Sequence, residues 1–342
     1  MKHHFGVMRK PNQNLLAVSV MLAFSVTTFV HVFVFPLYGE LPRGRTMRQV
    51  IDFEQSLCRT NVRAMQGPTW RHHCPRHGIV TVEQGGRLGN QMWEYAATWA
   101  VARMTSLEPY VPRCIRKQLD EVFRDLSVPS LSHVSHCPID WSNAVHSPDL
   151  WSDTNQSIVL PKYGVFPDLV LAWAEDIRQE FRFHDNLWET SLRVLEGAGK
   201  SVNRTPATYV GVHVRRTDYR EYLWRTRKII LAGADYFINA MEYFRAKYGD
   251  NVVFLIVSDD PSWCQQNLVA DQGDVFVVSK NGISSPGQDL AIMAACNHSI
   301  IDYGTFGVWG AILASGETIV YNVSRHASLR VAELLPNWNV LN

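Results

Sequence analysis

The second half of the sequence alternates short apolar segments with longer helical ones. Five apolar segments of strand length follow one another from Tyr209 onward, and helical stretches separate them. A chain in which strands and helices alternate forms a parallel sheet with helices on both faces. We therefore expect an α/β fold with a doubly wound parallel sheet, whose ligands bind outside the carboxyl ends of the strands. The expected strands are Tyr209–Val214, Val252–Val257, Val275–Val278, Ser299–Ile301 and Thr318–Tyr321.

The first half contains one clear strand–loop–helix unit. Ile79–Val82 indicates a short strand, Glu83–Gly89 a turn, and Asn90–Met104 a helix with a regular apolar period. Residues 105–205 are interrupted by Pro and His, until a further helix is expected at about Asp185–Leu195. With 342 residues, the chain has room for two compact domains or one large one.

Two adjacent arginines follow the first strand of the regular half. In His213-Val-Arg-Arg-Thr-Asp218 they come shortly after the apolar run that begins at Tyr209. Arginines at the mouth of a buried strand are costly to desolvate unless an anion receives them. A diphosphate is suitable, because guanidinium groups form paired, charge-assisted hydrogen bonds with phosphate oxygens. The alternative is an intramolecular pair between an arginine and a carboxylate at the strand end.

A glycine-rich loop, Gly85-Gly-Arg-Leu-Gly-Asn-Gln91, connects the strand and the helix of the first half. Its glycines, Gly89 among them, would let backbone N–H groups approach an anionic ligand at the helix N-terminus. The loop has neither the Gly-Lys-Ser/Thr of a Walker loop nor the Gly-x-Gly-x-x-Gly of a dinucleotide site. Arg87, Asn90 and Gln91 place three polar groups around it, although a tight turn capped by Asn90 would explain the same residues.

Polar residues also follow later strands. Ser258-Asp-Asp-Pro261 ends an apolar strand and starts a helix, so Asp259 and Asp260 would either cap that helix or contact a ligand. Asp289 lies near the start of an apolar helix, where it could cap the helix or accept two hydrogen bonds from guanine. Gly304-Thr-Phe-Gly307 leads into another helix and offers backbone amides suited to phosphate. The chain has no Asp-x-Asp, the usual manganese-binding element of one large class of sugar transferases.

Residues Leu15–Phe35 contain no Asp, Glu, Lys or Arg. A helix of this length, at about 1.5 Å per residue, crosses a bilayer core of about 30 Å, so we expect a transmembrane anchor. Basic residues before it, including Arg9 and Lys10, favour a cytoplasmic tail over residues 1–14. Residues 36–77 lack a sustained apolar period and would form a stem. A cleaved signal peptide is the alternative, but no small-x-small cleavage site follows the apolar run.

The body behind this anchor carries features of an oxidising compartment. Asn155, Asn203 and Asn322 stand in sequons that could accept glycans, whereas we expect the sequon at Asn297 to be buried and unused. Six cysteines permit disulfides whose pairing cannot be read from their spacing, and the lack of a Cys-x-x-Cys argues against a zinc site of that kind. The near balance of 33 basic and 32 acidic residues argues against a nucleic-acid partner.

These segments together resemble the α-1,2-fucosyltransferase family. The family's motifs stand at Gly86–Gln91, His213–Asp218, Ser258–Asp260 and Cys296–Trp309, in the expected order, and the resemblance covers residues 79–325. It implies an inverting enzyme that transfers L-fucose from GDP-fucose to O2 of a terminal galactose on a glycan, without a metal. It also implies a single-pass type II Golgi membrane protein whose lumenal body has two facing Rossmann-like domains of the GT-B type. These would be an N-terminal acceptor-side domain over residues 78–205 and a C-terminal GDP-fucose-binding domain over residues 206–342.

The resemblance further implies roles for single residues. Arg215 and Arg216 would hold the β-phosphate and stabilise the negative charge that grows on the leaving group. His213 and Asp289 would recognise guanine. Arg87, Asn90 and Gln91 would face the sugar and the acceptor, and Asn90 is also a catalytic candidate. Further donor-site candidates are Gly89, Asp259, Asp260, Gly304, Thr305 and Phe306.

The catalytic base and the acceptor stay open at this stage. Asp218 and Glu83 are both candidates for the base, while a dissociative transition state could need little base assistance. Residues 105–205 are unlike the family's familiar pattern, and this region would shape the acceptor site. The alternatives are a fucosyltransferase with another acceptor or linkage, and a membrane-tethered glycan-binding relative that has lost turnover.

Overall fold

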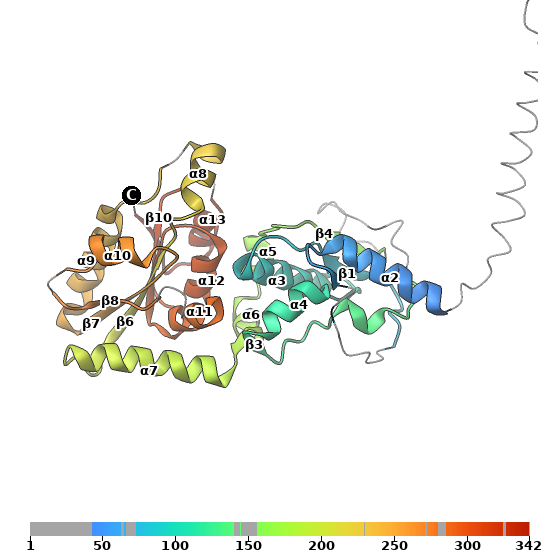
Figure 1. The fold of residues 1–342 in the computed structure, drawn as a ribbon, viewed down its shortest axis with the longest axis horizontal. Helices are drawn as coiled ribbons and strands as arrows, with labels where there is room; N and C mark the ends of the chain where they lie inside the picture. Colours follow the sequence, from blue (N-terminus) through green and yellow to red (C-terminus); the bar gives the residue numbers. More distant parts are fainter. Residues whose placement is uncertain are drawn as a thin grey trace, which may run out of the picture.

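The computed structural model describes residues 43–341, except 63–64, 66–72, 140–143, 145–155, 229, 271, 280–284 and 324–325. Two parallel sheets and one short antiparallel strand pair form the framework, so the expected α/β class with parallel sheets is confirmed (Figure 1). The predicted tail over residues 1–14 and the predicted anchor over Leu15–Phe35 lie outside the described residues. Within the described ranges, no helix has both the length and the apolar character needed to cross a bilayer.

The larger sheet contains six parallel strands in the order β11-β10-β9-β6-β7-β8. All five strands expected from the sequence are present, and β11 is an additional edge strand that the sequence pattern did not reveal. The order of winding reverses between β6 and β9, and such a switch point leaves a crevice at the carboxyl ends of the strands. The strands are β6 (Thr208–Val214), β7 (Val252–Ser258), β8 (Val275–Val277), β9 (His298–Ile301), β10 (Thr318–Tyr321) and β11 (Trp338–Leu341).

Helices cover both faces of this sheet (Figure 1). All seven residues of β7 are buried, and its side chains alternate between two apolar clusters, as the pleat requires. Phe254 and Ile256 pack with α9 (Ala234–Tyr248) and α10 (Pro261–Asn267). Val253, Leu255 and Val257 belong to the cluster that includes α11 (Pro286–Ala295) and α12 (Thr305–Ala314). Two further helices of this half are α8 (Tyr219–Arg227) and α13 (Ala327–Leu334), and α13 also packs on α5 (Pro167–Leu171) of the other half.

The smaller sheet has three parallel strands in the order β2-β1-β4. Its predicted strand β1 (Ile79–Val82) leads into α3 (Leu88–Met104), a helix that is buried along most of its length. A helix apolar on all sides must pack on several partners, and α3 contacts β1 as well as α12 of the larger sheet. The remaining elements of this half are β2 (Glu108–Pro109), α4 (Arg113–Asp120), β3 (Phe123–Arg124), η3 (Leu131–Val134), β4 (Ile158–Leu160), α5 (Pro167–Leu171), α6 (Ala174–Glu180) and β5 (Arg182–Phe183).

Part of the segment predicted as a stem is folded onto the body. Helix α2 (Arg43–Leu57) buries Val50 and Leu57 against β1, β4 and η3. Glu54 on this helix is 1% exposed and pairs with Arg113, and Cys58 is joined to Cys114 by a disulfide. The stem over residues 36–77 is therefore not an extended linker throughout.

Helix α7 (Asp185–Ser201) joins the two halves of the chain. The predicted boundary at residue 205 would assign it to the first domain, yet it packs on α11 and β7 of the larger sheet. Gln288 of α11 donates to the Leu187 carbonyl and to the Ser191 hydroxyl of α7. We therefore use "N-terminal half" for the elements from α2 to β5, and "C-terminal half" for α7 and the elements that follow it.

Candidate functional site

A cavity of about 470 Å³ lies between the two halves, at the switch point of the larger sheet. Its volume falls within the range of about 300–1,000 Å³ that small-molecule sites occupy. Most of the predicted site residues line it, although Gln91, Arg216 and Asp260 do not. The predicted residues in its wall are Arg87, Gly89, Asn90, His213, Arg215, Asp218, Asp259, Asp289, Gly304, Thr305 and Phe306.

Arg215 is held in the cavity wall by two carboxylates. Its Nη2 donates to Asp218 Oδ1 at 2.6 Å, and its Nη1 lies 3.1 Å from Asp259 Oδ2. The side chain is 19% exposed, so part of the guanidinium remains accessible from the cavity. The intramolecular pairing considered as an alternative therefore exists, and it fixes the guanidinium where an anion could reach it.

Arg216 points away from the cavity. Its guanidinium carbon lies 3.6 Å from the centre of the Trp263 ring, and its Nη1 donates to the Ala232 carbonyl at 3.2 Å. Side chains alternate between the two faces of β6, and Arg216 continues on the face of Val214, whose apolar cluster includes Trp263. The predicted clamp of two arginines on one phosphate is thus reduced to Arg215.

The two neighbouring aspartates after β7 have different partners. Asp260 caps α10, because its Oδ1 accepts a hydrogen bond from the Trp263 backbone N at 3.1 Å. Asp259 accepts from the backbone N of Arg216 at 2.8 Å and from that of Thr217 at 3.2 Å. The predicted capping role is therefore confirmed for Asp260. Asp259 instead fixes the backbone that follows Arg215, beside the cavity.

The N-terminal ends of α3 and α12 meet at the cavity. Asn90 Oδ1 accepts a hydrogen bond from Thr305 Oγ1 at 3.1 Å, which links the two halves. A Cβ atom on Gly89 would lie 2.6 Å from the Phe306 backbone N, so only glycine permits this approach. Gly304 has φ of +88°, a left-handed conformation that favours glycine. Two helix N-termini at one cavity make its wall suitable for an anion.

His213 is held by a carboxylate that our sequence analysis missed. Its Nδ1 lies 3.1 Å from Asp302 Oδ1, and its ring centre lies 5.5 Å from that of Phe306. Burial raises the pKa of Asp302, while its contact with His213 and two backbone donors act in the opposite direction. A Cβ on Gly307 would lie 2.5 Å from His213 Nδ1, so the ring is packed tightly. The sequence did contain a sign of this carboxylate, because Asp302 is an acidic residue directly after the buried strand β9.

Asp218 bridges the two halves. Besides Arg215, its carboxylate contacts Arg87 of the glycine-rich loop, with Arg87 Nη2 3.4 Å from Asp218 Oδ2. Its side chain is 50% exposed and lines the cavity. Glu83, the other candidate base, is not part of the cavity wall. Asp289 does line the cavity, and its Oδ2 accepts a hydrogen bond from Ser279 Oγ at 3.1 Å.

Other side chains in the wall carried no sequence signal of their own. Gln118 of α4 and Tyr219 at the start of α8 both line the cavity. Tyr219 stacks on Tyr303, with ring centres 5.1 Å apart. Gln91, by contrast, is 1% exposed inside the N-terminal half, because it lies on the face of α3 that turns away from the cavity.

Glu94 of α3 holds the glycine-rich loop in place through a hydrogen bond to its backbone. Its Oε1 accepts from the backbone N of Gly85 at 2.8 Å and from that of Tyr163 at 3.1 Å. The side chain is fully buried, and burial raises the pKa of Glu94 from its usual 4.5 to about 8. The amide hydrogen bonds and the Arg59 charge lower it only in part.

This raised pKa predicts how stability depends on pH. Between pH 4.5 and about 8, folded Glu94 retains a proton that the unfolded chain has released. The free energy of unfolding should therefore fall as pH rises through this window, by up to about 1.4 kcal/mol per pH unit. Glu94→Gln keeps an acceptor oxygen and removes the titration, so its urea midpoint should change less with pH. An equal pH slope in both proteins would contradict this assignment.

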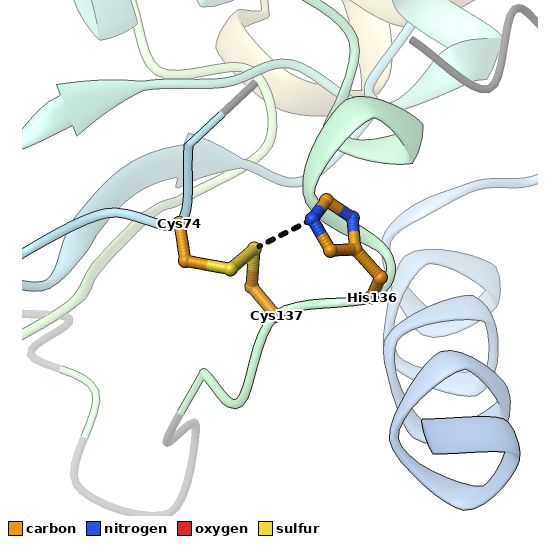
Figure 2. Close-up of side chains that lie close together, drawn as sticks. All are labelled: Cys74, His136 and Cys137. Carbon is orange, nitrogen blue, oxygen red and sulfur yellow. Dashed lines mark hydrogen bonds between the residues drawn. A yellow bond between two sulfur atoms is a disulfide. The ribbon is translucent and has the colours of Figure 1, made fainter. Parts of the chain in front are cut away.

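Four of the six cysteines form disulfides, Cys58 with Cys114 and Cys74 with Cys137, while Cys264 and Cys296 are buried thiols. Among the described residues, Cys74, His136 and Cys137 form a group with the spacing of a metal site. Figure 2 shows His136 beside the Cys74–Cys137 disulfide, with its Nε2 3.7 Å from Cys137 Sγ. Sulfurs joined to each other offer no thiolate ligands, so this group does not fit a metal.

The predicted glycan acceptors are only partly described. Asn203 and Asn322 are exposed, and Asn155 lies outside the described residues. The expectation that Asn297 is buried is wrong, because Asn297 is exposed directly before β9. Its Oδ1 accepts from the Tyr209 backbone N at 2.9 Å, and Ser299 of the same sequon is fully buried.

Comparisons with known proteins agree with these motifs. The family model described as Glycosyl transferase family 11 matches residues 49–342. A Mus musculus protein named Galactoside alpha-(1,2)-fucosyltransferase 2 is 36% identical, over 76% of this chain and 78% of that protein. The Bos taurus protein of the same name is 31% identical, over 93% of this chain and 92% of that protein. Among solved structures, fucosyltransferase NodZ from Bradyrhizobium has a TM-score of 0.49 and 14% identity, covering 73% of this chain and 96% of that chain.

Proposed function

This chain belongs to glycosyl transferase family 11, and we propose that it transfers L-fucose from GDP-fucose to O2 of a terminal galactose, forming an α-1,2 linkage with inversion. The observation that carries this proposal is the cavity in which Arg215 meets the N-termini of α3 and α12. In fold terms, the two halves act as facing Rossmann-like domains of the GT-B type. The C-terminal half holds the donor, and the N-terminal half holds the acceptor.

The donor lies along the carboxyl edge of the larger sheet. Its diphosphate faces Arg215 and the backbone amides of Thr305 and Phe306, which together supply positive charge and directed N–H groups. Guanine lies toward His213 and Asp289, because a carboxylate can accept two hydrogen bonds from the N1–H and N2–H₂ edge of this base.

Bond breaking places negative charge on the departing GDP and positive charge on the fucosyl ring. Arg215 is already oriented by Asp218 and Asp259, so it stabilises the leaving group without reorganising. The galactose O2 then attacks the opposite face of an oxocarbenium-like carbon. Asp218 is half exposed in the cavity wall beside Arg215, so its carboxylate accepts the proton from O2.

The acceptor enters from the N-terminal half. Arg87, Asn90 and Gln118 line that side of the cavity and offer hydrogen-bond groups to sugar hydroxyls. Gln118 lies within the region predicted to shape the acceptor site. Gln91 supports the helix and does not itself contact the acceptor.

We also propose that the protein is a type II membrane protein of the Golgi with its catalytic body in the lumen. The support is the uncharged segment Leu15–Phe35 and the two disulfides of the body, which persist in oxidising compartments. Exposed Asn203 and Asn322 would be accessible for glycosylation there.

The direct test incubates the full chain in detergent with GDP-fucose and galactose-terminated acceptors. We expect a fucosylated product whose NMR spectrum shows an α-1,2 linkage. A product with another linkage would show that the acceptor assignment is wrong, while the assignment of GDP-fucose as the donor would stand. If GDP-fucose is neither bound nor consumed, the proposed function is wrong.

Removal of divalent metals should leave this transfer intact. The charge of the leaving group is met by Arg215 and the helix N-termini, and the chain has no Asp-x-Asp to hold manganese. We expect the initial rate in excess EDTA to match the rate in added Mn²⁺ or Mg²⁺. A rate that collapses in EDTA and returns on adding one of these ions would contradict the metal-free mechanism.

A further inference from the structure

Asp302 contacts two residues of the proposed nucleotide site with both of its carboxylate oxygens. Oδ1 lies 3.1 Å from His213 Nδ1 and accepts from the Tyr303 backbone N at 2.7 Å. Oδ2 accepts from the Arg215 backbone N at 2.7 Å. Asp302 is 1% exposed, and it directly follows β9 at the switch point of the sheet.

These contacts decide which nitrogen of His213 carries the proton. Backbone N–H groups can only donate, so the Tyr303 and Arg215 amides make both Asp302 oxygens acceptors. When Asp302 is ionised it can only accept, so the third contact is also a donor and His213 Nδ1 carries a proton. His213 lines the cavity while its Nδ1 faces a buried carboxylate, so Nε2 is the ring nitrogen that remains for a ligand.

We propose that Asp302 is a positioning residue that fixes His213 in the Nδ1–H tautomer, so that Nε2 accepts a hydrogen bond from the nucleoside part of the donor. The same carboxylate also fixes the backbone at Arg215, because it accepts a hydrogen bond from the Arg215 amide. The inference rests on the proposed function, since it requires a nucleotide in this cavity. It adds that a hydrogen-bond donor of the ligand, an amino, ring N–H or ribose hydroxyl group, faces His213.

The test replaces one oxygen of Asp302. Asp302→Asn preserves the shape of the side chain but replaces one acceptor oxygen with an NH₂ group. In either orientation this NH₂ opposes a backbone N–H, that of Tyr303 or that of Arg215, so the variant holds His213 less well. We expect ¹⁵N NMR of the imidazole to show Nδ1–H in the unmodified protein, with the signals assigned by their loss in His213→Ala. The dissociation constant for GDP should rise about tenfold in Asp302→Asn, the order expected for one hydrogen bond.

A double-mutant cycle separates positioning from general damage. If Asp302 acts mainly through His213, Asp302→Asn should raise the GDP dissociation constant by a smaller factor when His213 is already alanine than when His213 is present. Asp274→Asn is the matched control, because Asp274 is 2% exposed in the same half but pairs with Arg245 and Arg204 away from the cavity. This control should lower the melting temperature and leave GDP affinity unchanged.

Two results would overturn the inference: an Nε2–H tautomer in the unmodified protein, or an equal loss of GDP affinity with and without His213. The His213 tautomer of the unmodified protein can be measured even if Asp302→Asn does not fold. Failure of the unmodified protein to bind GDP would instead refute the proposed function, and the tautomer would still be measurable.

Discussion

Arg215→Ala is expected to lower kcat for fucosyl transfer by about 10²–10³-fold, the loss seen when one preorganised donor to developing charge is removed. Arg215 lines the cavity, and Asp218 and Asp259 hold its guanidinium in place before any ligand arrives. Removing it takes away the positive charge and also leaves two carboxylates beside a diphosphate whose negative charge grows as the bond breaks. The measurement is the initial rate at saturating GDP-fucose, so that weakened donor binding does not conceal the effect on the chemical step.

A matched arginine controls for the loss of one positive charge. Arg225 on α8 is 74% exposed and pairs with Glu221, so Arg225→Ala changes net charge equally without touching the cavity. Its kcat should stay within about twofold of the unmodified value, as for surface substitutions generally. If Arg215→Ala retains near-normal kcat while folded, the leaving-group role assigned to Arg215 is wrong.

The sequence predicted the larger sheet well because its strands are buried on both faces. Such strands are continuous apolar runs, as in β7, and they stand out between helices. The edge strand β11 escaped detection because Asn339 and Val340 are exposed, so its four residues lack that pattern. Strands β2 and β3 contain only two residues each and leave no periodic signal.

The site was predictable in outline for a topological reason. The carboxyl ends of parallel strands lie at one edge of a sheet, so polar residues after β6, β7 and β9 had to approach one another. Which of two adjacent residues faces the cavity depends on the pleat, and the sequence could not distinguish Arg215 from Arg216. Glu94 was hidden for another reason, since an acidic residue in a helix usually faces solvent, whereas α3 is buried on all sides.

Gly89→Ala is expected to reduce kcat/KM by about 10²-fold or more while the protein remains folded, because a displacement of about 1 Å in a catalytic site can have that effect. Alanine is favoured over glycine inside a helix by about 1 kcal/mol, so α3 itself should tolerate the change. The added Cβ would lie 2.6 Å from the Phe306 backbone N and 2.8 Å from the Thr305 carbonyl carbon. Backbone atoms cannot turn aside as a flexible side chain can, so the two helix N-termini must separate. The hydrogen bond between Asn90 and Thr305 would lengthen, and Arg87 would move relative to Asp218.

Gly197→Ala provides the control for this substitution. Gly197 lies in α7, and no heavy atom lies within 4 Å of the Cβ that alanine would add. This variant should gain up to about 1 kcal/mol of stability from helix propensity and keep normal kinetics. Melting temperature and kcat/KM are measured on both proteins. A Gly89→Ala enzyme with unchanged kcat/KM would mean that the close contact between α3 and α12 is not needed for transfer, and that the two halves form the site without touching at this point.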